Sequence, residues 1–461
     1  MKMNPWTLLA MLILVFVALA VPLGAQTIFY VDSATGSDTH IGTSWGTAFR
    51  NVTKAVAAAD TSAAPEVDIW IAKGTYWPTD GVSSLPADHR DTSFAFYRGN
   101  GIGKALKIYG GFAGTETSIT MRDTANHTYL DGQLGTDTAS FHVVVVAGLP
   151  AAADSLVLDG LTIRHGVAGA SGVRVYNSVP VYQYGGGGIA LYSDSSLKFV
   201  IRNCVVQNNY SGTGGGMYCS SALYTMINCT MTGNSCTSGT VAGGAMYNVN
   251  ATPMLRSCSF TSNHCSSSNN SAGGVMSNQS SMLQIVNCIF QNNYCDVQGG
   301  YTTDGAYGGA VYSNNSTLTI DSCTFTANRV AGGTLGGGAL CFGGALYNTT
   351  GNTVIRNSSF SLNVSSSVER EGPLRGGKGY GGAIYNYGSP GLISSCNFYR
   401  NRAIGYAYSD APGESGWGYG GAIANFYYAP DVANCTFTAD TAFGAWAGGY
   451  SVGGGCGGGH I

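Results

Sequence analysis

A short pattern of glycine, aliphatic, cysteine and asparagine residues repeats eight times between residues 186 and 440 of this 461-residue chain. Each copy begins with Gly-Gly, a small residue and an aliphatic residue. In every copy after the first, Cys or Ser follows fourteen residues after the second Gly, Phe or Met stands two residues further on, and a polar residue stands three beyond that. The polar position holds Asn209, Asn234, Asn263, Asn293, Asn328, Asn363, Asn401 and Asp440.

This repeat predicts a solenoid of strands. Apolar residues two positions apart with polar neighbours are typical of short strands that bury one face. We infer three strands and three corners in each copy. Gly-Gly forms one corner without steric cost, and the Asn or Ser before the Cys position forms another, because Asn tolerates left-handed backbone. The predicted fold class is all-β: a right-handed, single-stranded parallel β-helix with an N-terminal cap that contains a short helix.

Stacked coils bring the same position of each copy together at the strand spacing of about 4.8 Å. We therefore expect Phe to stack on Phe, Cys on Cys, and Asn to hydrogen bond to Asn in a side-chain ladder. The expected ladder residues are Asn234, Asn263, Asn293, Asn328, Asn363 and Asn401.

Three segments are expected. Residues 1–25 read as a signal peptide, because Lys2 precedes an apolar run too short for a membrane span, and small residues lead up to Gln26. Residues 26–155 read as the cap and irregular first coils, and residues 156–461 as the β-helix repeats. The chain ends in SVGGGCGGGHI, where the next Gly-Gly corner begins, so we expect a truncated array. The expected location is secreted, either extracellular or on a bacterial outer-membrane surface.

Charge argues against two classes of partner. Only 10% of residues are charged and the net charge is −3, so neither nucleic acid nor an anionic membrane is an expected partner. We expect no cofactor and no transmembrane span in the mature chain. No metal site is expected, since no close Cys/His pairs with zinc-finger spacing occur. The Asp32–Asp38 segment reads as a polar turn in preference to a calcium loop.

The 13 cysteines fall mostly into two columns. One lies at the inward Cys position and suits packed, free thiols, since Cys behaves as a small buried hydrophobe. The second column lies two residues past the ladder Asn and allows a disulfide between Cys236 and Cys265 or between Cys265 and Cys295.

The loops between the ladder Asn and the next Gly-Gly lengthen along the chain, and insertions of this kind often form the binding face of a solenoid. Aromatic and charged residues gather in these loops. They can contact sugars or protein partners, or they can pack the loops onto the coil. The ligand-binding candidates are Tyr380, Tyr406, Tyr408, Trp417, Tyr419, Glu369, Arg370, Asp410 and Glu414.

No catalytic residue is assigned. Glycoside hydrolysis needs a pair of carboxylates, and the acidic residues from Gly185 onward mostly stand singly or in the variable loops. No nucleophile and base can be paired from the sequence.

The repeat resembles that of the chlamydial polymorphic outer-membrane proteins, which are adhesin-like autotransporters with β-helical passengers. The resemblance rests on GGAMY…FTSN, GGAVY…FTAN and GGAIY…FYRN and covers residues 185–440. The segment from YVDSATGSD to IAKGTYWP is similar to the caps of secreted β-helix proteins of the pectin-lyase-like superfamily.

These observations lead to one main functional hypothesis and two alternatives. The main hypothesis is a non-enzymatic secreted or surface protein whose loops bind a glycan or a surface protein in adhesion. The first alternative is a carbohydrate-active enzyme, a polysaccharide lyase or glycoside hydrolase, with its site in the loops at 364–419. The second is a passive structural stalk.

Overall fold

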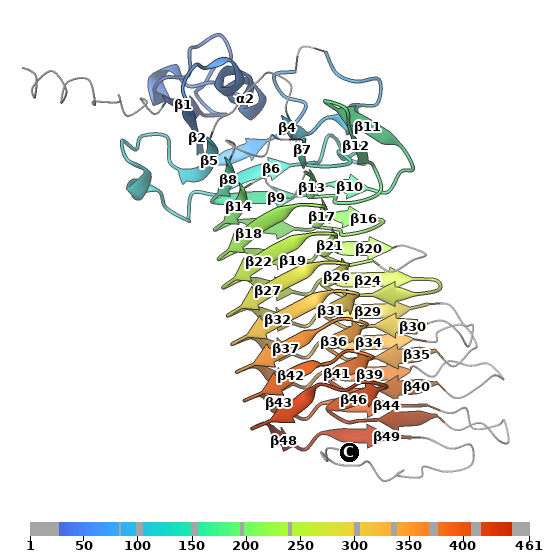
Figure 1. Ribbon diagram of the computed structural model, residues 1–461. Helices are drawn as coiled ribbons and strands as arrows, with labels where there is room; N and C mark the ends of the chain where they lie inside the picture. Colours follow the sequence, from blue (N-terminus) through green and yellow to red (C-terminus); the bar gives the residue numbers. More distant parts are fainter. Residues whose placement is uncertain are drawn as a thin grey trace, which may run out of the picture.

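The computed structural model describes residues 27–444, apart from 83, 98–104, 149–154, 194–197, 238–241, 299–304, 333–338, 368–376 and 407–415. The chain winds into a tall stack of coils, with the N-terminal cap at one end and the last coil at the other (Figure 1). Strands of successive coils pair in parallel and in register. The all-β solenoid predicted from the repeat is confirmed. The expected signal peptide lies outside the described residues.

A regular coil contains four strands, so the prediction of three is wrong. One such coil runs through β17 (Met217–Ser220), β18 (Leu223–Ile227), β19 (Thr230–Thr232) and β20 (Ser235–Thr237). Each of these strands belongs to a different sheet that runs along the stack. The segment after the ladder Asn, which the repeat suggests is loop, pairs with its neighbours instead, and from β25 (Ser271–Ala272) onward a fifth sheet is added.

Two sheets run from the cap to the last coil, and successive strands within each are hydrogen-bonded neighbours. The 12-stranded sheet contains β1 (Thr27–Val31), β2 (Glu66–Ala72), β5 (Ala105–Phe112), β8 (Ser155–Asp159), β14 (Lys198–Arg202), β18, β22 (Thr252–Arg256), β27 (Met282–Val286), β32 (Thr317–Asp321), β37 (Thr353–Arg356), β42 (Gly391–Ser394) and β47 (Asp431–Ala433). The 11-stranded sheet contains β3 (Gly74–Tyr76), β6 (Thr128–Asp131), β9 (Leu161–Arg164), β15 (Val205–Gln207), β19, β23 (Ser259–Thr261), β28 (Ile289–Gln291), β33 (Thr324–Thr326), β38 (Ser359–Ser361), β43 (Asn397–Tyr399) and β48 (Thr436–Thr438).

The other sheets follow the remaining sides of the coil. The 10-stranded sheet contains β4 (Phe94–Tyr97), β7 (Val144–Ala147), β13 (Ile189–Tyr192), β17, β21 (Met246–Val249), β26 (Met276–Gln279), β31 (Val311–Asn314), β36 (Leu346–Thr349), β41 (Ile384–Tyr387) and β46 (Ile423–Phe426). The 9-stranded sheet contains β10 (Val167–Ala168), β16 (Tyr210–Ser211), β20, β24 (His264–Ser267), β29 (Tyr294–Val297), β34 (Arg329–Gly332), β39 (Val364–Ser367), β44 (Arg402–Ile404) and β49 (Thr441–Phe443). The 5-stranded sheet contains β25, β30 (Gly305–Tyr307), β35 (Leu340–Phe342), β40 (Lys378–Tyr380) and β45 (Trp417–Tyr419).

Left-handed backbone recurs at the corners. The corner before the Cys position has positive φ at Asn228 (52°), Ser257 (52°) and Asn287 (54°), as the residue types there predict. The corner after the Phe-bearing strand has positive φ as well, but it is occupied by such residues as Leu362 (58°) and Arg400 (54°). These side chains seldom adopt this conformation, whereas Asn208, Gly233, Ser262 and Asn292 hold the same corner in earlier copies, so residue type reveals this corner only in the earlier copies.

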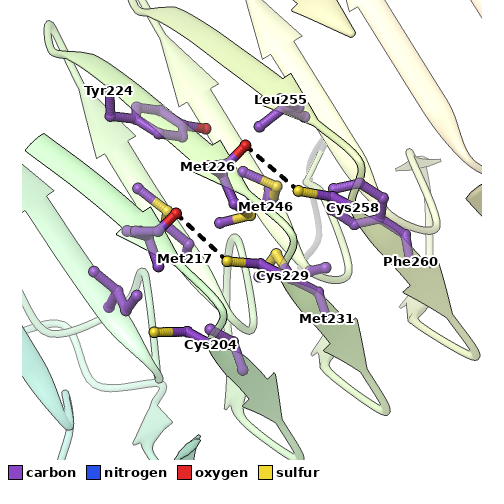
Figure 2. Packing of buried hydrophobic residues seen from close by; sticks show 14 of the residues in the cluster. Cys204, Met217, Tyr224, Met226, Cys229, Met231, Met246, Leu255, Cys258 and Phe260 are labelled. Atoms are coloured by element: carbon purple, nitrogen blue, oxygen red, sulfur yellow. Dashed lines mark hydrogen bonds between the residues drawn. The ribbon is translucent and has the colours of Figure 1, made fainter. Parts of the chain in front are cut away.

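The core is a set of columns of like residues. Figure 2 shows Met246, Leu255, Cys258 and Phe260 packed together inside the coil, all of them buried. The Phe rings stack along the axis with centroid separations of 4.5–5.1 Å. Column packing of this kind explains why the repeat keeps its residue types so closely. The stacked rings belong to Phe260, Phe290, Phe325, Phe360, Phe398 and Phe437.

The Asn column forms a buried side-chain ladder. Asn263 Nδ2 donates to Asn293 Oδ1 at 3.1 Å and to the Met231 carbonyl at 2.9 Å, while its backbone N–H also donates to Asn293 Oδ1 at 3.0 Å. The same bonds recur from Asn209 to Asn401, which donates to Asp440. Because each amide is saturated, the polar column is stable inside the stack.

A second Asn ladder, which the repeat does not predict, lies on the 10-stranded sheet. Asn248 Nδ2 donates to Asn278 Oδ1 at 2.8 Å, and Asn386 Nδ2 donates to Asn425 Oδ1 at 2.8 Å. The column is interrupted by Ser313, which stands in register with Asn278, so the sequence shows it less clearly than the first ladder.

The cap covers the open end of the stack. Helix α2 (Val52–Thr61) turns Val52, Ala55 and Ala59 onto the core, which shields the first coil from water. Short 3₁₀ turns η1 (Trp45–Thr47), η2 (His89–Asp91) and η3 (Ile119–Met121) and the hairpin of β11 (Val173–Tyr176) and β12 (Val179–Tyr182) complete this end. Among the described helices, none has the length and apolar character to cross a membrane.

Candidate functional site

A cleft of about 460 Å³ opens beside the strand ends at the capped end of the 11-stranded sheet. Its walls come from β3, β6 and β9 and from the segments that follow β3 and β6; β6 and β9 lie just below the cap in Figure 1. The cleft combines an indole, two carboxylates, an amide and a guanidinium. Its lining residues are Thr75, Trp77, Thr79, Asp80, Asp131, Gln133, Leu134, Gly135 and Arg164.

Asp131 organises the inner wall of the cleft. It is the last residue of β6, is 4% exposed, and stands in register with Arg164 of β9. Its Oδ2 accepts a bond from Arg164 Nε at 2.8 Å, and its Oδ1 accepts bonds from the Gln133 N–H at 3.0 Å and from His165 Nδ1 at 2.9 Å. Both oxygens are therefore occupied, and this carboxylate positions its neighbours.

Arg164 is fixed through its Nε and the Tyr129 ring, while its two terminal nitrogens are available to a ligand. Its guanidinium carbon lies 4.0 Å from the centroid of the Tyr129 ring, and its Nε is bonded to Asp131. Within the part of the chain that the structure describes, its two terminal nitrogens have no hydrogen-bond partner. A guanidinium fixed in this way can donate two parallel bonds to a ligand oxygen pair without first losing side-chain freedom.

Trp77 and Asp80 form the outer wall. Trp77 follows β3, lines the cleft and is 39% exposed, so part of its indole is accessible. A turn places Asp80 next to it, with the Asp80 N–H donating to the Trp77 carbonyl at 3.2 Å. Burial in the wall raises the pKa of the Asp80 carboxyl above its ordinary value, because the charged form loses hydration.

Among the predicted ligand-binding residues that the structure describes, Tyr380 is half-buried and the others are more exposed. Tyr380 lies between Phe342 and Tyr419, with centroids 4.9 Å away on each side, so both of its faces are covered. Tyr419, Trp417 and Tyr406 are 42%, 51% and 37% exposed. The remaining candidates, Glu369, Arg370, Tyr408, Asp410 and Glu414, lie outside the described residues.

The predictions about metal binding at Asp32 and Asp38 and about the cysteines concern residues that all lie outside the cleft. The carboxylates of Asp32 and Asp38 accept hydrogen bonds from nearby backbone N–H groups, as in a polar turn. The described residues contain no group of three or more His, Cys, Asp or Glu side chains that could hold a metal ion. The described cysteines, including Cys236, Cys265 and Cys295, are unlinked in this structure, and the disulfide in the second column stays a prediction.

Sequence reasoning missed the cleft because the search for carboxylates began with the regular repeats. A signal is nevertheless present. The segments YLDG and TIRHG occupy the same position in two successive coils, and they place Asp131 beside Arg164. Charged residues at a position that is later held by Gln, Thr, Ser or Tyr mark these coils as different.

A model of the right-handed β-helix region matches residues 160–360, and the fold is a right-handed parallel β-helix. No curated protein matches the chain. Three similar solved structures are the pectate lyase Pel9A (13% identity, 89% of this chain and 78% of that chain, TM-score 0.38), the pectin methylesterase PemA from Erwinia chrysanthemi (12%, 79% and 89%, 0.30) and a rhamnogalacturonan lyase (11%, 82% and 74%, 0.18).

Proposed function

We propose that this β-helix is a secreted or surface-exposed protein that binds saccharides, without cleaving them, in the cleft between the cap and the first coils. The observation that carries the proposal is the pairing of an exposed indole, Trp77, with a guanidinium, Arg164, that is fixed by Asp131 and Tyr129. An aromatic face packs against the C–H face of a sugar ring, while fixed polar groups select its hydroxyl or carboxylate oxygens.

Binding without cleavage is favoured over hydrolysis by the state of the carboxylates. Hydrolysis needs one carboxylic acid and one carboxylate that is free to act as base or nucleophile. Asp80, with its raised pKa, can serve as the acid. Asp131 accepts three hydrogen bonds and has a positioning role instead.

A second contact surface, here called the loop corner, is formed by Tyr406, Trp417 and Tyr419 beside the long loops. Trp417 and Tyr419 of β45 and Tyr406 are each more than a third exposed, and exposed aromatic residues are enriched at recognition surfaces. We assign adhesion to a glycan or surface protein to this corner, as the loop lengths suggest, and treat the cleft as the specific sugar site.

The proposal is tested with the full chain on an array of neutral, amino and acidic oligosaccharides, followed by calorimetry with the ligands that bind. Trp77→Ala and Arg164→Gln should each weaken binding by roughly tenfold or more. Tyr399→Ala is the matched control, because Tyr399 is an aromatic residue near the far end of the same sheet.

Three results would contradict the proposal. An array without binding, or binding that Tyr399→Ala weakens as much as Trp77→Ala, would exclude the cleft. Release of new reducing ends from a bound oligosaccharide, abolished by Asp80→Asn, would replace binding by hydrolysis. Loss of binding in Trp417→Ala, with none in Trp77→Ala, would move the sugar site to the loop corner.

A further inference from the structure

Three cysteines form a second, shorter column in the 9-stranded sheet. Cys236 of β20, Cys265 of β24 and Cys295 of β29 stand in register on adjacent strands, and all three are fully buried. Neighbouring strands lie about 4.8 Å apart, within the Cα separation of roughly 4.4–6.8 Å that a disulfide spans. The strand spacing therefore puts neighbouring cysteines of this column within disulfide reach.

The inward cysteine column has the same stacking but different thiol contacts. There, each thiol donates to backbone carbonyls: Cys258 Sγ donates to the Met226 carbonyl at 3.5 Å, as Figure 2 shows, and to the Arg256 carbonyl at 3.2 Å. The Cys258 N–H in turn donates to Cys288 Sγ at 3.4 Å. Each sulfur of the inward column is thus engaged with main-chain groups.

In the second column two sulfurs are in direct contact. Cys236 Sγ lies 2.9 Å from Cys265 Sγ, and its thiol donates to it. Cys295 Sγ has different hydrogen-bond partners: its thiol donates to Ser271 Oγ at 3.4 Å and to the Tyr307 carbonyl at 3.7 Å, while the Ser271 hydroxyl donates to Cys265 Sγ at 3.2 Å. The contact therefore distinguishes one pair from the other.

We propose that Cys236 and Cys265 form an intercoil disulfide and that Cys295 remains a free thiol. The reaction needs an external disulfide, from a small molecule or an oxidoreductase. The Cys265 thiolate attacks this disulfide and releases one thiolate, and the Cys236 thiolate then displaces the second from the mixed disulfide. Two protein thiols are oxidised, two thiols of the oxidant are formed, and the two protons are transferred to them or to water.

The link belongs to the folding of this coil pair. Both sulfurs are fully buried in the finished stack, so the exchange must take place before the surrounding chain closes over them. The bond would fix β24 on β20 and close a ring that spans one turn of the solenoid. Constraint of the unfolded chain by such a ring stabilises the folded state. The inference stands independently of any ligand.

The test uses the full chain exported to an oxidising compartment, denatured in the presence of an alkylating reagent and without reductant. We expect two fewer alkylated cysteines than after reduction, out of the 13 in the chain, and one linked peptide pair that contains Cys236 and Cys265. Labelling of all 13 cysteines without reduction would overturn the proposal, as would a link between Cys265 and Cys295.

Three cysteine variants test whether the link involves Cys236 and Cys265 and no other cysteine. Cys295→Ser and the inward-column control Cys229→Ser should keep the link, whereas Cys265→Ser should lose it. In the native chain, reduction should lower the melting temperature, and it should have no such effect in Cys265→Ser. If reduction lowered the melting temperature of Cys265→Ser as much as that of the native chain, the link would also be refuted. The peptide map of the native chain tests the link even if a variant does not fold.

Discussion

The regular coils from residue 186 onward and the cap with the first coils solve the same stacking problem with different chemistry. The regular coils stack Phe on Phe and Asn on Asn. The first coils hold most of the ion pairs: among the described residues, those of Glu66, Asp131 and Asp159 have their acidic partner before residue 186, Arg202 of the first regular coil pairs with Asp159, and only the pair of His264 and Asp296 lies wholly within the regular coils. The repeated columns stabilise the regular coils, whereas the irregular first coils contain the charged residues that line the candidate cleft.

The cluster around Asp159 illustrates the second kind of coil. Arg122 and Arg202 both donate to Asp159 Oδ2, at 3.1 and 2.7 Å, and Asn203 donates to Oδ1. Burial opposes ionisation of this carboxyl, but these hydrogen bonds together lower its pKa. Such a group has no equivalent in a column of identical residues, because like charges stacked at the strand spacing repel one another.

The largest effect is expected from the Phe column. Phe325 is fully buried, and its ring stacks on Phe290 at 4.5 Å and on Phe360 at 4.7 Å. Phe325→Ala should lower the free energy of unfolding by about 4 kcal/mol, since it removes a large side chain from a site that cannot collapse. Urea unfolding measures this. The control is Thr324→Ala on the same strand, where the side chain is exposed; an equal loss there would contradict the column model.

The Asn ladder should rank second. Asn293→Ala removes the bonds to Asn263, Asn328 and the Phe260 carbonyl, and it leaves buried polar groups without partners. We expect a loss of about 3 kcal/mol in the free energy of unfolding, again measured in urea. Gln291→Ala, at an exposed position of the same coil, is the control and should be nearly neutral. A loss below about 1 kcal/mol for Asn293→Ala would show that the ladder specifies register more than stability.

In the first coils, we expect the free energy of unfolding to fall as the pH is lowered. His142 is buried, its Nδ1 lies 2.9 Å from the Gly186 carbonyl, and burial lowers its pKa to about 4 despite the nearby charge of Asp91. The unfolded chain binds this proton near pH 6.5, so stability is full above that pH and falls as the pH drops towards 4. The expected loss is about 2–3 kcal/mol.

This acid sensitivity is measured from unfolding free energies between pH 7 and 4, with tryptophan fluorescence reporting on the cap. His142→Asn should flatten the pH dependence. His127→Asn, a change of an exposed histidine, should leave it unchanged. A steep acid loss that persists in His142→Asn would assign the sensitivity to other groups.

The sequence predicts the regular coils better than it predicts the cap and the first coils. Eight copies identify the fold, because residues such as Phe260 and Asn263 recur at positions that only a stack of coils brings together. The number of strands per coil is less accessible, since the missed strand follows the ladder Asn, in the segment whose length varies from copy to copy. The cleft is least accessible: Asp131, Arg164 and Trp77 meet only because three irregular coils stack, and no period predicts irregular coils.

The smallest stability change is expected at Trp77, which sharpens the contrast within the cap itself. Trp70 is 4% exposed and stacks on Phe112 with centroids 4.7 Å apart, whereas Trp77 is 39% exposed at the cleft. Trp77→Ala should change the free energy of unfolding by less than about 0.5 kcal/mol, and Trp70→Ala should lower it by about 3–5 kcal/mol. Both are measured in urea beside saccharide binding. If Trp77→Ala destabilised the chain as Trp70→Ala does, its loss of binding would report unfolding, and the indole would belong to the core of the cap rather than to a site.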